Sequence, residues 1–348
     1  MCLALCGAIG VVSAAQPQVK LEPQDSGTTV RLRGISAVDA NIAWASGREG
    51  TVLRTLDGGK HWTQVSVPDA KDLDFRDIEA FDATTAVVLS IGPGAASRVY
   101  RTEDGGKHWT LALKNTDERA FFDCMAFDGR KGWMWGDPVE GAFQVRTTTD
   151  GGRTWSLDKK PGSGMWKDEA AFAASGTCIA STKHGPVAVS GGGASRLHDL
   201  ASGIIVFVPM PSHVPGAGIF SVAPRGGDLL LVGGDFEHES RGSAALGRFD
   251  AMHRWSTDRL PDPRGYRSGA ACFGDTLCLA VGPNGVDALR GERWTAVTDT
   301  GYDAIDLARN AGWMSGDKGR IARITLSSSL SPPGSPSKSK QAAPPSKP

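Results

Sequence analysis

The sequence has no net charge and no long hydrophobic run. Lysine plus arginine and aspartate plus glutamate each number 38 in 348 residues, so no electrostatic argument favours nucleic acid or an anionic membrane. No run of eighteen apolar residues occurs, which is too little for a membrane-spanning helix. We therefore expect no nucleic acid among the partners and no membrane-spanning segment.

Motifs for cofactors are also missing. No Gly-x-Gly-x-x-Gly segment lies between a strand and a helix, and no cysteine pair or Cys/His cluster has the spacing of a haem or zinc site. We expect no cofactor and no metal. Among the six cysteines, Cys272 and Cys278 flank a short turn-like segment. This spacing fits either a disulfide across a hairpin or two buried thiols.

One short motif recurs three times at a nearly constant spacing. Residues 55–62 read TLDGGKHW, residues 102–109 read TEDGGKHW and residues 148–155 read TTDGGRTW. Their tryptophans are separated by 47 and 46 residues, which indicates a repeat architecture. The spacing S/T-x-D-x-G-x-x-W is that of the Asp-box, also called the BNR repeat.

The residues of this motif predict a turn between two strands. The aspartate can accept backbone N–H groups, the glycines supply positive φ, and the tryptophan can wedge between neighbouring sheets. Because the same residues occupy the same place in successive repeats, we assign them a structural role and no catalytic one. These residues are Asp57, Gly59, Trp62, Asp104, Gly106, Trp109, Asp150, Gly152 and Trp155.

Units of about 45 residues continue beyond the three motifs. First strands that share one pattern begin near residues 33, 76, 122, 167, 218, 267 and 302. Apolar runs bounded by glycine, such as residues 43–47 and 312–316, read as buried second strands. The sequence thus predicts an all-β fold, a seven-bladed β-propeller with Asp-box turns over residues 28–326.

The two ends of the chain are expected to differ from the repeats. The seventh unit lacks an outer strand, and residues 28–32 form an extra one, so we expect them to close the ring rather than leave a frayed last blade. Residues 1–15 have the pattern of a signal peptide, which favours a periplasmic or secreted protein, and residues 16–27 read as a linker. The Ser/Pro/Lys-rich residues 327–348 are expected to be a disordered tail.

With these motifs, the seven units and the segments LRGI (32–35) and WASG (44–47), the chain resembles the photosystem II stability/assembly factor family, in its bacterial, non-photosynthetic branch. The resemblance covers about residues 28–326 and is strongest from 30 to 160. Members are seven-bladed propellers with Asp-box turns. Exported relatives have no settled activity, so the resemblance implies a binding scaffold rather than a reaction.

Charged residues recur where the aligned first strands begin. If the units are blades, these residues converge at one mouth of the central channel. Arginines there would offer forked donors to a carboxylate, a phosphate or an acidic partner segment, and aspartates would orient them. Alternatively, neighbouring blades pair these charges with each other. The predicted ligand-binding residues are Arg33, Arg76, Asp77, Asp123, Lys167, Asp168, Arg267 and Asp303, with Phe122 and Tyr302 as an apolar wall.

The leading hypothesis is an exported binding scaffold, a monomer that takes a protein partner or a small anionic or carbohydrate ligand. The second hypothesis is a glycoside hydrolase of the sialidase type, which needs an arginine cluster, a Tyr–Glu pair and a carboxylic acid. The chain has only three tyrosines, and sialidases have six blades rather than seven. A cofactor-dependent oxidoreductase is the weakest hypothesis.

Overall fold

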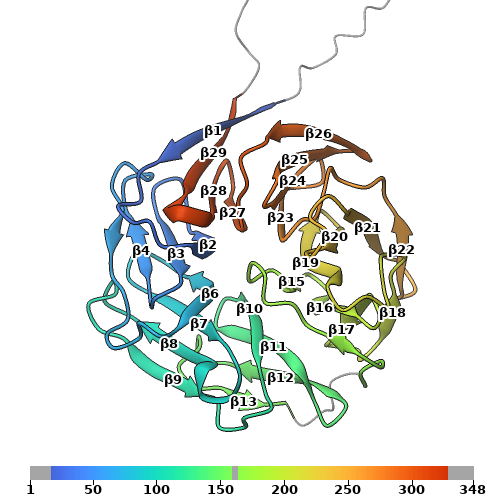
Figure 1. The fold of residues 1–348 in the computed structure, drawn as a ribbon, viewed down its shortest axis with the longest axis horizontal. Coiled ribbons are helices and arrows are strands. Elements are labelled where there is room, and N and C mark those ends of the chain that lie inside the picture. Colours follow the sequence, from blue (N-terminus) through green and yellow to red (C-terminus); the bar gives the residue numbers. More distant parts are fainter. Residues whose placement is uncertain (1–16, 159–163, 328–348) are drawn as a thin grey trace, which may run out of the picture.

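The computed structural model describes residues 17–158 and 164–327 of the 348-residue chain. The expected signal peptide lies outside the described residues, as does all but the first residue of the expected C-terminal tail. Antiparallel sheets are arranged in a ring around a common centre (Figure 1), which confirms the predicted all-β propeller. Within the described ranges, no helix is long and apolar enough to cross a membrane.

Five sheets have four strands each, and two short 3-10 helices, η1 (Gly94–Ala96) and η2 (Asp317–Gly319), lie in loops. The first contains β2 (Leu32–Ala37), β3 (Ala43–Gly47), β4 (Val52–Thr55) and β5 (Thr63–Gln64). The second contains β6 (Asp74–Ala80), β7 (Ala86–Ile91), β8 (Arg98–Thr102) and β9 (Thr110–Lys114). The third contains β10 (Phe122–Asp128), β11 (Lys131–Val139), β12 (Ala142–Thr148) and β13 (Ser156–Leu157). Another contains β23 (Gly269–Phe273), β24 (Leu277–Gly282), β25 (Gly285–Arg290) and β26 (Arg293–Thr298). The last contains β27 (Ala304–Ala308), β28 (Ala311–Ser315), β29 (Ile321–Ser327) and β1 (Gln18–Gln24).

The remaining sheet has nine strands and joins two groups. One group contains β14 (Glu169–Ala170), β15 (Ile179–Thr182), β16 (Gly185–Gly192), β17 (Arg196–Asp199) and β18 (Ile205–Phe207). The other contains β19 (Ala217–Arg225), β20 (Asp228–Asp235), β21 (Gly242–Phe249) and β22 (Trp255–Arg259). A single residue pair, Gly191 with Gly218, connects β16 to β19. Because the two groups share one sheet, the count of seven blades stays a prediction.

An N-terminal strand closes the ring, as predicted, but it is not the predicted segment. The strand is β1, which pairs antiparallel with β29 from Gln18 opposite Ser327 to Gln24 opposite Ile321. Residues 28–32 lie outside β1, and only the last of them begins β2, so the expected linker 16–27 contains the closing strand. An outermost strand packs on one side only, and β1 contributes just Val19 and Leu21 to the core. Its apolar pattern is therefore too weak to recognise.

The repeated motif forms the turn that its residues predict. In the first copy, Thr55 Oγ1 accepts the Gly59 N–H at 2.8 Å, and Asp57 Oδ1 accepts the His61 N–H at 3.0 Å. Gly59 has a φ of 83°, which only glycine adopts readily. The other two copies make the same contacts to threonine and aspartate. The motif thus joins the third strand of its sheet to the fourth.

The core lies between neighbouring sheets, and the motif tryptophans contribute to it. Trp109 packs against the cluster between the first and second sheets, and its indole N–H donates to the Val65 carbonyl at 2.9 Å. Trp62 donates instead to the side-chain oxygen of Gln24 at 3.1 Å. Trp155 is buried between the second and third sheets, and its indole nitrogen has no hydrogen-bond partner within the described part of the chain.

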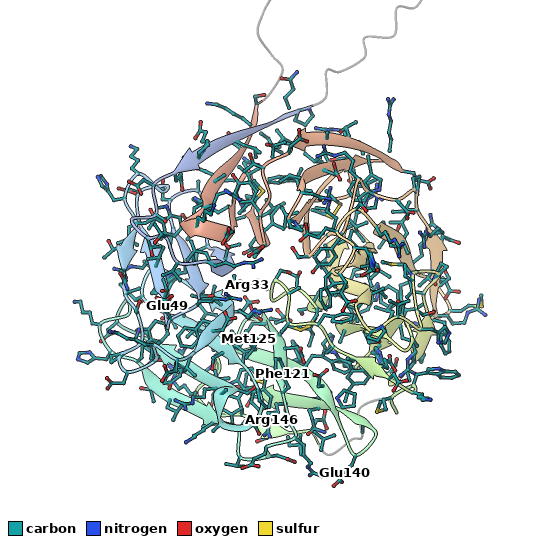
Figure 2. The ribbon with its side chains drawn as sticks, in the orientation of Figure 1. Arg33, Glu49, Phe121, Met125, Glu140 and Arg146 are labelled. Atoms are coloured by element: carbon teal, nitrogen blue, oxygen red, sulfur yellow. A yellow bond between two sulfur atoms is a disulfide. The ribbon has the colours of Figure 1, made fainter. Side chains whose placement is uncertain are left out.

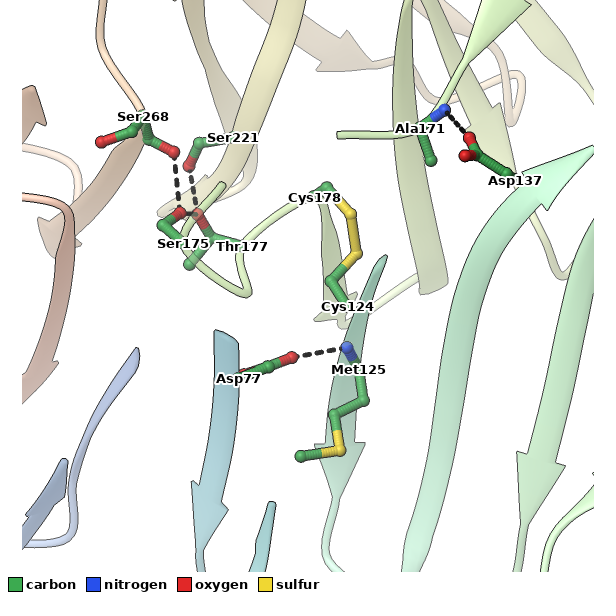
Figure 3. Close-up of a disulfide and its surroundings, with 10 residues drawn as sticks. All are labelled: Asp77, Cys124, Met125, Asp137, Ala171, Ser175, Thr177, Cys178, Ser221 and Ser268. Carbon is green, nitrogen blue, oxygen red and sulfur yellow. Dashed lines mark hydrogen bonds between the residues drawn. A yellow bond between two sulfur atoms is a disulfide. The ribbon is translucent and has the colours of Figure 1, made fainter. Parts of the chain in front are cut away.

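Side chains of one sheet satisfy backbone groups on the inner edge of the next. Asp77 on β6 accepts the Met125 N–H of β10 at 2.6 Å (Figure 3), and Asp306 on β27 accepts the Ala37 N–H of β2 at 2.8 Å. The same kind of contact joins Ser36 to Ala80, Asp137 to Ala171 and Ser221 to Ala270. Buried backbone groups need such partners, so these contacts hold adjacent sheets together around the centre.

Two disulfides are present. Cys272 and Cys278 lie directly opposite each other on β23 and β24 and are bonded, which resolves the two sequence-based alternatives. Cys124 on β10 is bonded to Cys178, 54 residues later, immediately before β15. The sequence did not predict this second bond. It links the third sheet to the nine-stranded sheet close to the centre of the ring (Figure 3).

Candidate functional site

A cavity of about 530 Å³ lies at the centre of the ring, where the first strands of several sheets begin. Figure 2 places Arg33 at the edge of the central opening. The charged and aromatic side chains that line the cavity fall into three chemical groups. These are the arginines Arg31, Arg33, Arg48 and Arg76, the acids Asp123, Asp137, Glu239 and Asp303, and the aromatics Phe121, Phe172, Phe220, Phe236 and Tyr266.

The cavity brings together half of the predicted ligand-binding residues. Those that line it are Arg33, Arg76, Asp123 and Asp303. Those that do not are Asp77, Lys167, Asp168 and Arg267. Charged residues at the strand starts of the first, second, third and last sheets therefore converge on one cavity. Their role in binding a ligand stays a prediction.

Two arginines of the β2 region share one carboxylate. Arg31 makes a forked contact with Asp303, at 2.6 Å from Nε and 3.0 Å from Nη2. Arg33 lies 3.6 Å from the same carboxylate and donates to the Ala174 carbonyl at 3.2 Å. Burial and the nearby charge of Arg76 lower the pKa of Arg33 to about 10. One negative charge thus serves two guanidinium groups, which leaves this side of the cavity positive.

Arg76 on β6 adds to this positive charge. Its Nε donates to Asp74 at 3.1 Å, and its Nη1 donates to the Ala173 carbonyl at 2.5 Å. Asp74 is itself shared, because Arg48 lies 3.7 Å from the same carboxylate. The two shared carboxylates therefore compensate the four arginines only in part.

Two further acids of the cavity lining, Asp123 and Asp137, have raised pKa values. Asp123 is 2% exposed, and within the described ranges its Oδ2 has no hydrogen-bond partner. Burial and the neighbouring charge of Asp137 raise the pKa of Asp123 well above its usual range. Burial likewise raises the pKa of Asp137. Both effects favour the protonated form, so these two side chains oppose the arginine charge less than solvent-exposed aspartates would.

A loop that the sequence did not predict forms part of the cavity lining. In the repeat unit that begins near residue 167, the innermost strand is interrupted. Both β14 and β15 pair with β16, and residues 171–178 loop out between them. We call residues 171–178 the central loop. Its carbonyls bind Arg33 and Arg76, and Ser175 donates to the Ser268 carbonyl at 2.7 Å (Figure 3). Gly176 lies so close to Asp77 that a Cβ would fall 2.3 Å from the carboxylate.

The central loop explains why two predicted residues lie elsewhere. The repeat pattern predicts a continuous inner strand that begins with residues 167–172. Only Glu169 and Ala170 form a strand there, and Lys167 and Asp168 lie in an exposed turn before it. Lys167 and Asp168 therefore do not line the cavity, and their role in binding a ligand stays a prediction.

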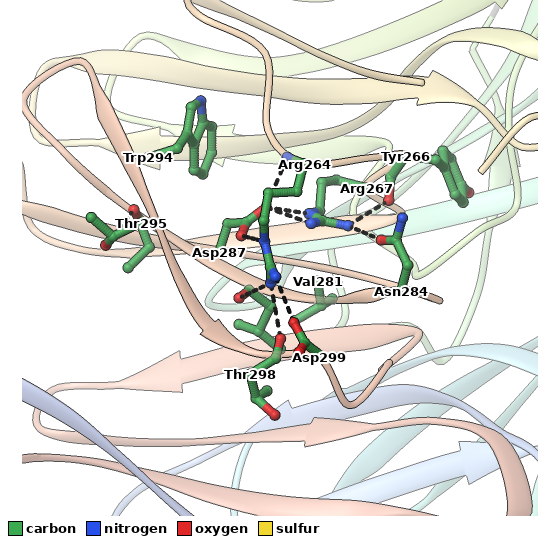
Figure 4. Close-up of polar contacts among 12 residues, drawn as sticks. Arg264, Tyr266, Arg267, Val281, Asn284, Asp287, Trp294, Thr295, Thr298 and Asp299 are labelled. Atoms are coloured by element: carbon green, nitrogen blue, oxygen red, sulfur yellow. Dashed lines mark hydrogen bonds and ion pairs between the residues drawn. The ribbon is translucent and has the colours of Figure 1, made fainter. Parts of the chain in front are cut away.

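Two other predicted residues are buried and satisfied by the protein itself. Arg267 is fully buried, pairs with Asp287, and donates to the Asn284 side chain at 2.5 Å (Figure 4). Asp77 is also buried and holds the backbone of β10. For these two residues the alternative prediction applies, because other groups of the protein bind their charged side chains. Neither residue lines the cavity.

The aromatic wall is made by different residues from those predicted. Phe122 and Tyr302 are 1% and 4% exposed and do not line the cavity. Phe121 and Tyr266 do, and they precede Phe122 and Arg267 by one position. Phe121 immediately precedes β10 and Tyr266 lies in the loop before β23, so these rings come from residues beside the aligned strand starts.

A buried Ser–His–Glu group lies away from the cavity. Ser190 Oγ is 2.9 Å from His198 Nε2 and donates to Glu169, which also pairs with Arg196. Ser190 and His198 are almost completely buried, and the His198 ring packs against Trp135. A substrate cannot reach these atoms, so the group stabilises the fold. Among the described residues, no group of three or more His, Cys, Asp or Glu side chains is placed to hold a metal ion.

Comparisons with known proteins show the fold alone. No protein-family model and no curated protein matches the sequence. Among solved structures, the chain is similar to "YCF48 bound to D1 peptide", at 16% identity and a TM-score of 0.61, over 92% of this chain and 99% of that one. YCF48 from Cyanidioschyzon merolae is similar at 16% identity and a TM-score of 0.63, over 88% of this chain and 98% of that one. Virginiamycin B lyase from Staphylococcus aureus is similar at 15% identity and a TM-score of 0.60, over 89% of this chain and 100% of that one. The resemblance to photosystem II assembly factors is thus supported at the level of the fold.

Proposed function

We propose that the protein is an exported β-propeller binding scaffold that receives an anionic group of a protein partner in the central cavity. The observation that carries this proposal is the pair Arg33 and Arg76. Both line the cavity, and the charge of Arg76 lowers the pKa of Arg33. Arg33 shares the Asp303 carboxylate with Arg31, and Arg76 shares the Asp74 carboxylate with Arg48. A guanidinium group binds carboxylate or phosphate through paired hydrogen bonds, so an incoming anion would relieve this repulsion.

The central position of the cavity supports a partner with a protruding segment rather than a flat surface. The guanidinium groups are held in place by the carbonyls of the central loop, so little ordering is required on binding. The similar propeller YCF48 binds a peptide, which makes a peptide segment of a partner the reasonable class of ligand. The bacterial, non-photosynthetic branch of that family remains part of the proposal.

Two disulfides support the exported location. Cys124 with Cys178 and Cys272 with Cys278 account for all cysteines in the described residues. Disulfides persist in oxidising compartments and are rare in the cytosol. We therefore propose a periplasmic or extracellular location.

A hydrolase of the sialidase type is the second candidate, because the cavity contains arginines together with Tyr266 and Glu239. Burial raises the pKa of Tyr266, whereas a nucleophilic tyrosine needs a base to favour its phenolate form. A fluorogenic sialidase substrate tests this candidate. Turnover that disappears in Tyr266→Phe would replace the scaffold proposal with a hydrolase.

The scaffold proposal is tested by capture of exported proteins from the native cell. We compare the wild type with a double variant, Arg33→Gln with Arg76→Gln. The matched control is Arg248→Gln with Arg293→Gln, which removes the same charge from exposed positions on β21 and β26. We expect capture to fall by more than about tenfold in the first variant and to persist in the control. Equal capture by all three proteins, with unchanged melting temperatures, would refute the proposal.

A further inference from the structure

The cavity has an aromatic wall in addition to its arginines. Phe172 of the central loop stacks on Phe220 of β19, with ring centroids 4.0 Å apart and planes inclined by 8°. Tyr266 meets Phe220 edge-on at 4.7 Å, and Phe236 meets it at 6.2 Å. Phe220 is 2% exposed, whereas Phe236 is 47% exposed. The wall is therefore already assembled, and its outer ring is open.

The aromatic wall and the arginines lie within a few atoms of each other. Phe172 belongs to the wall, and the next two residues, Ala173 and Ala174, accept hydrogen bonds from Arg76 and Arg33. Consecutive Cα atoms are about 3.8 Å apart, so the two chemical surfaces adjoin one another along the same loop. A ligand that uses both must carry its charge close to its apolar part.

Two buried polar atoms at the cavity have no partner in the part of the chain that the structure describes. They are Arg33 Nε and Asp123 Oδ2, on side chains that are 8% and 2% exposed. A buried polar atom without a partner is rare and costly, and its presence in a cavity marks a place for a ligand atom. Arg33 Nε is a donor, which suits an oxygen-bearing anion.

We propose that this cavity binds an anionic group carried a few atoms away from an aromatic ring. Arg33 and Arg76 bind the anion, and the accessible rings of the aromatic wall, Phe172 and Phe236, bind the ring of the ligand. The inference rests on the proposed function and names the chemistry that the partner must present. A cavity of about 530 Å³ falls in the range of ligand sites, about 300–1,000 Å³, and has room for one aromatic residue with its acid.

Four small probes separate the ring from the charge. N-acetylphenylalanine carries both, N-acetylphenylalaninamide lacks the charge, and N-acetylalanine lacks the ring. The fourth, acetyl-Phe-Asp-amide, carries the ring and the acid within a peptide segment. Titration calorimetry should show that the first and fourth probes bind at least about tenfold more tightly than the other two. The tighter of these two identifies the source, a free aromatic acid or a segment inside a partner chain.

Two single variants assign the probes to the cavity. Phe236→Ser removes the exposed ring, and Phe207→Ser is its matched control, because Phe207 is 58% exposed on the outer strand β18. Arg76→Gln removes one guanidinium, with Arg248→Gln as the control. We expect each cavity variant to weaken N-acetylphenylalanine by at least about fivefold, and each control to match the wild type.

The outcomes distinguish this inference from the proposed function. If N-acetylalanine or the amide binds as well as N-acetylphenylalanine, the inference is wrong. If no probe binds while the wild type still captures a partner through Arg33 and Arg76, the inference is again wrong and the scaffold proposal stands. If N-acetylphenylalanine binds through Phe236 and Arg76 and no partner is captured, the inference holds and the scaffold proposal fails.

Discussion

Charged residues near the centre of the ring differ in how much counter-charge the protein supplies. Arg267 is fully buried, and Asp287 beside it is also fully buried. Arg33 is nearly as buried, but it shares Asp303 with Arg31 and leaves its Nε without a partner in the described ranges. A buried charge is stable only when it is paired. Arg267 therefore serves the fold, whereas Arg33 keeps capacity for an anion from outside.

Asp287→Asn should strongly destabilise the protein. The variant leaves Arg267 charged, fully buried and without a counter-charge, which costs about 3–5 kcal/mol in comparable pairs. The measurement is urea unfolding at neutral pH. Asp299→Asn is the control, because Asp299 pairs with Arg264 at the surface and should matter little. Equal stability of the two variants would contradict a structural role for Arg267.

Asp306→Asn should change how stability depends on pH. Burial raises the pKa of Asp306 to about 6 in the folded protein, above its ordinary value of 3.8. The folded state thus holds the proton more tightly than the unfolded chain, so this stabilising effect is present at low pH and is lost as pH rises through about 6. Asparagine keeps an acceptor for the Ala37 N–H and cannot ionise.

Melting temperatures at about pH 5 and about pH 8 check this prediction. The melting temperature of the variant should increase relative to that of the wild type as pH rises. The charge of Asp306 also raises the pKa of Asp77 and Glu79, so its removal should add to this increase. A difference between variant and wild type that is the same at both pH values would show that Asp306 does not titrate in this way.

Among the elements, the central loop has the largest effect on the cavity. It replaces part of an inner strand, carries Phe172, and supplies the two carbonyls that bind Arg33 and Arg76. The disulfide between Cys124 and Cys178 fixes its C-terminal end to β10. The loop is thus held at both ends, by β14 and by this bond, which keeps the arginines in place before a ligand arrives.

Removal of the two disulfides should have unequal effects. Cys124→Ala with Cys178→Ala frees a span of 54 residues, and Cys272→Ala with Cys278→Ala frees a span of 6. A disulfide stabilises mainly by limiting the unfolded chain, by about 3–5 kcal/mol for the longer span and less for the shorter one. Denaturant unfolding should therefore rank the first pair as the more damaging. The opposite order would show that chain entropy does not dominate here.

Sequence analysis predicts the elements that recur and misses those that occur once. The Asp-box turns follow from identical residues in three copies, and their threonine and aspartate contacts are the same in each. The strand β1 has no second copy and only Val19 and Leu21 on its packed side, so its pattern is weak. The central loop interrupts a strand within a segment whose residues match the other first strands. Periodicity cannot indicate such an interruption, because the contacts of the loop, such as the bond from Cys178 to Cys124, are with residues distant in the sequence.

Half of the candidate site follows from the sequence for the same reason. Arg33, Arg76, Asp123 and Asp303 reach the cavity because they lie at or beside the starts of innermost strands, which the repeat locates. The aromatic wall depends on neighbouring positions and on loops, which align poorly. Tertiary contacts, such as the pair formed by Arg267 before β23 and Asp287 on β25, depend on how the strands pack and cannot be derived from the spacing of either residue.

At the scale of the whole molecule, the ring is closed by non-covalent contacts between the two ends of the chain. The strand β1 pairs with β29 along its full length, and Gln24 at its end connects three parts. The Gln24 side chain accepts the indole N–H groups of Trp62 and Trp313, both at 3.1 Å, and donates to the Gly58 carbonyl at 2.8 Å. It thereby ties the last sheet to the first Asp-box turn.

Deletion of residues 16–24 should prevent closure. It removes β1, exposes the edge of β29, and leaves the buried indole N–H of Trp313 without its partner. An unpaired edge is a template for aggregation, so we expect aggregated or loosely packed protein in size-exclusion chromatography and circular dichroism. Deletion of residues 331–348 is the control and should leave folding unchanged. A graded test is Gln24→Ala, which keeps the strand and should lower the free energy of unfolding by about 1–3 kcal/mol. A monomeric, cooperatively folded protein from the first deletion would mean that the ring does not need β1, because the remaining sheets would then hold it closed without a strand from the N-terminal end.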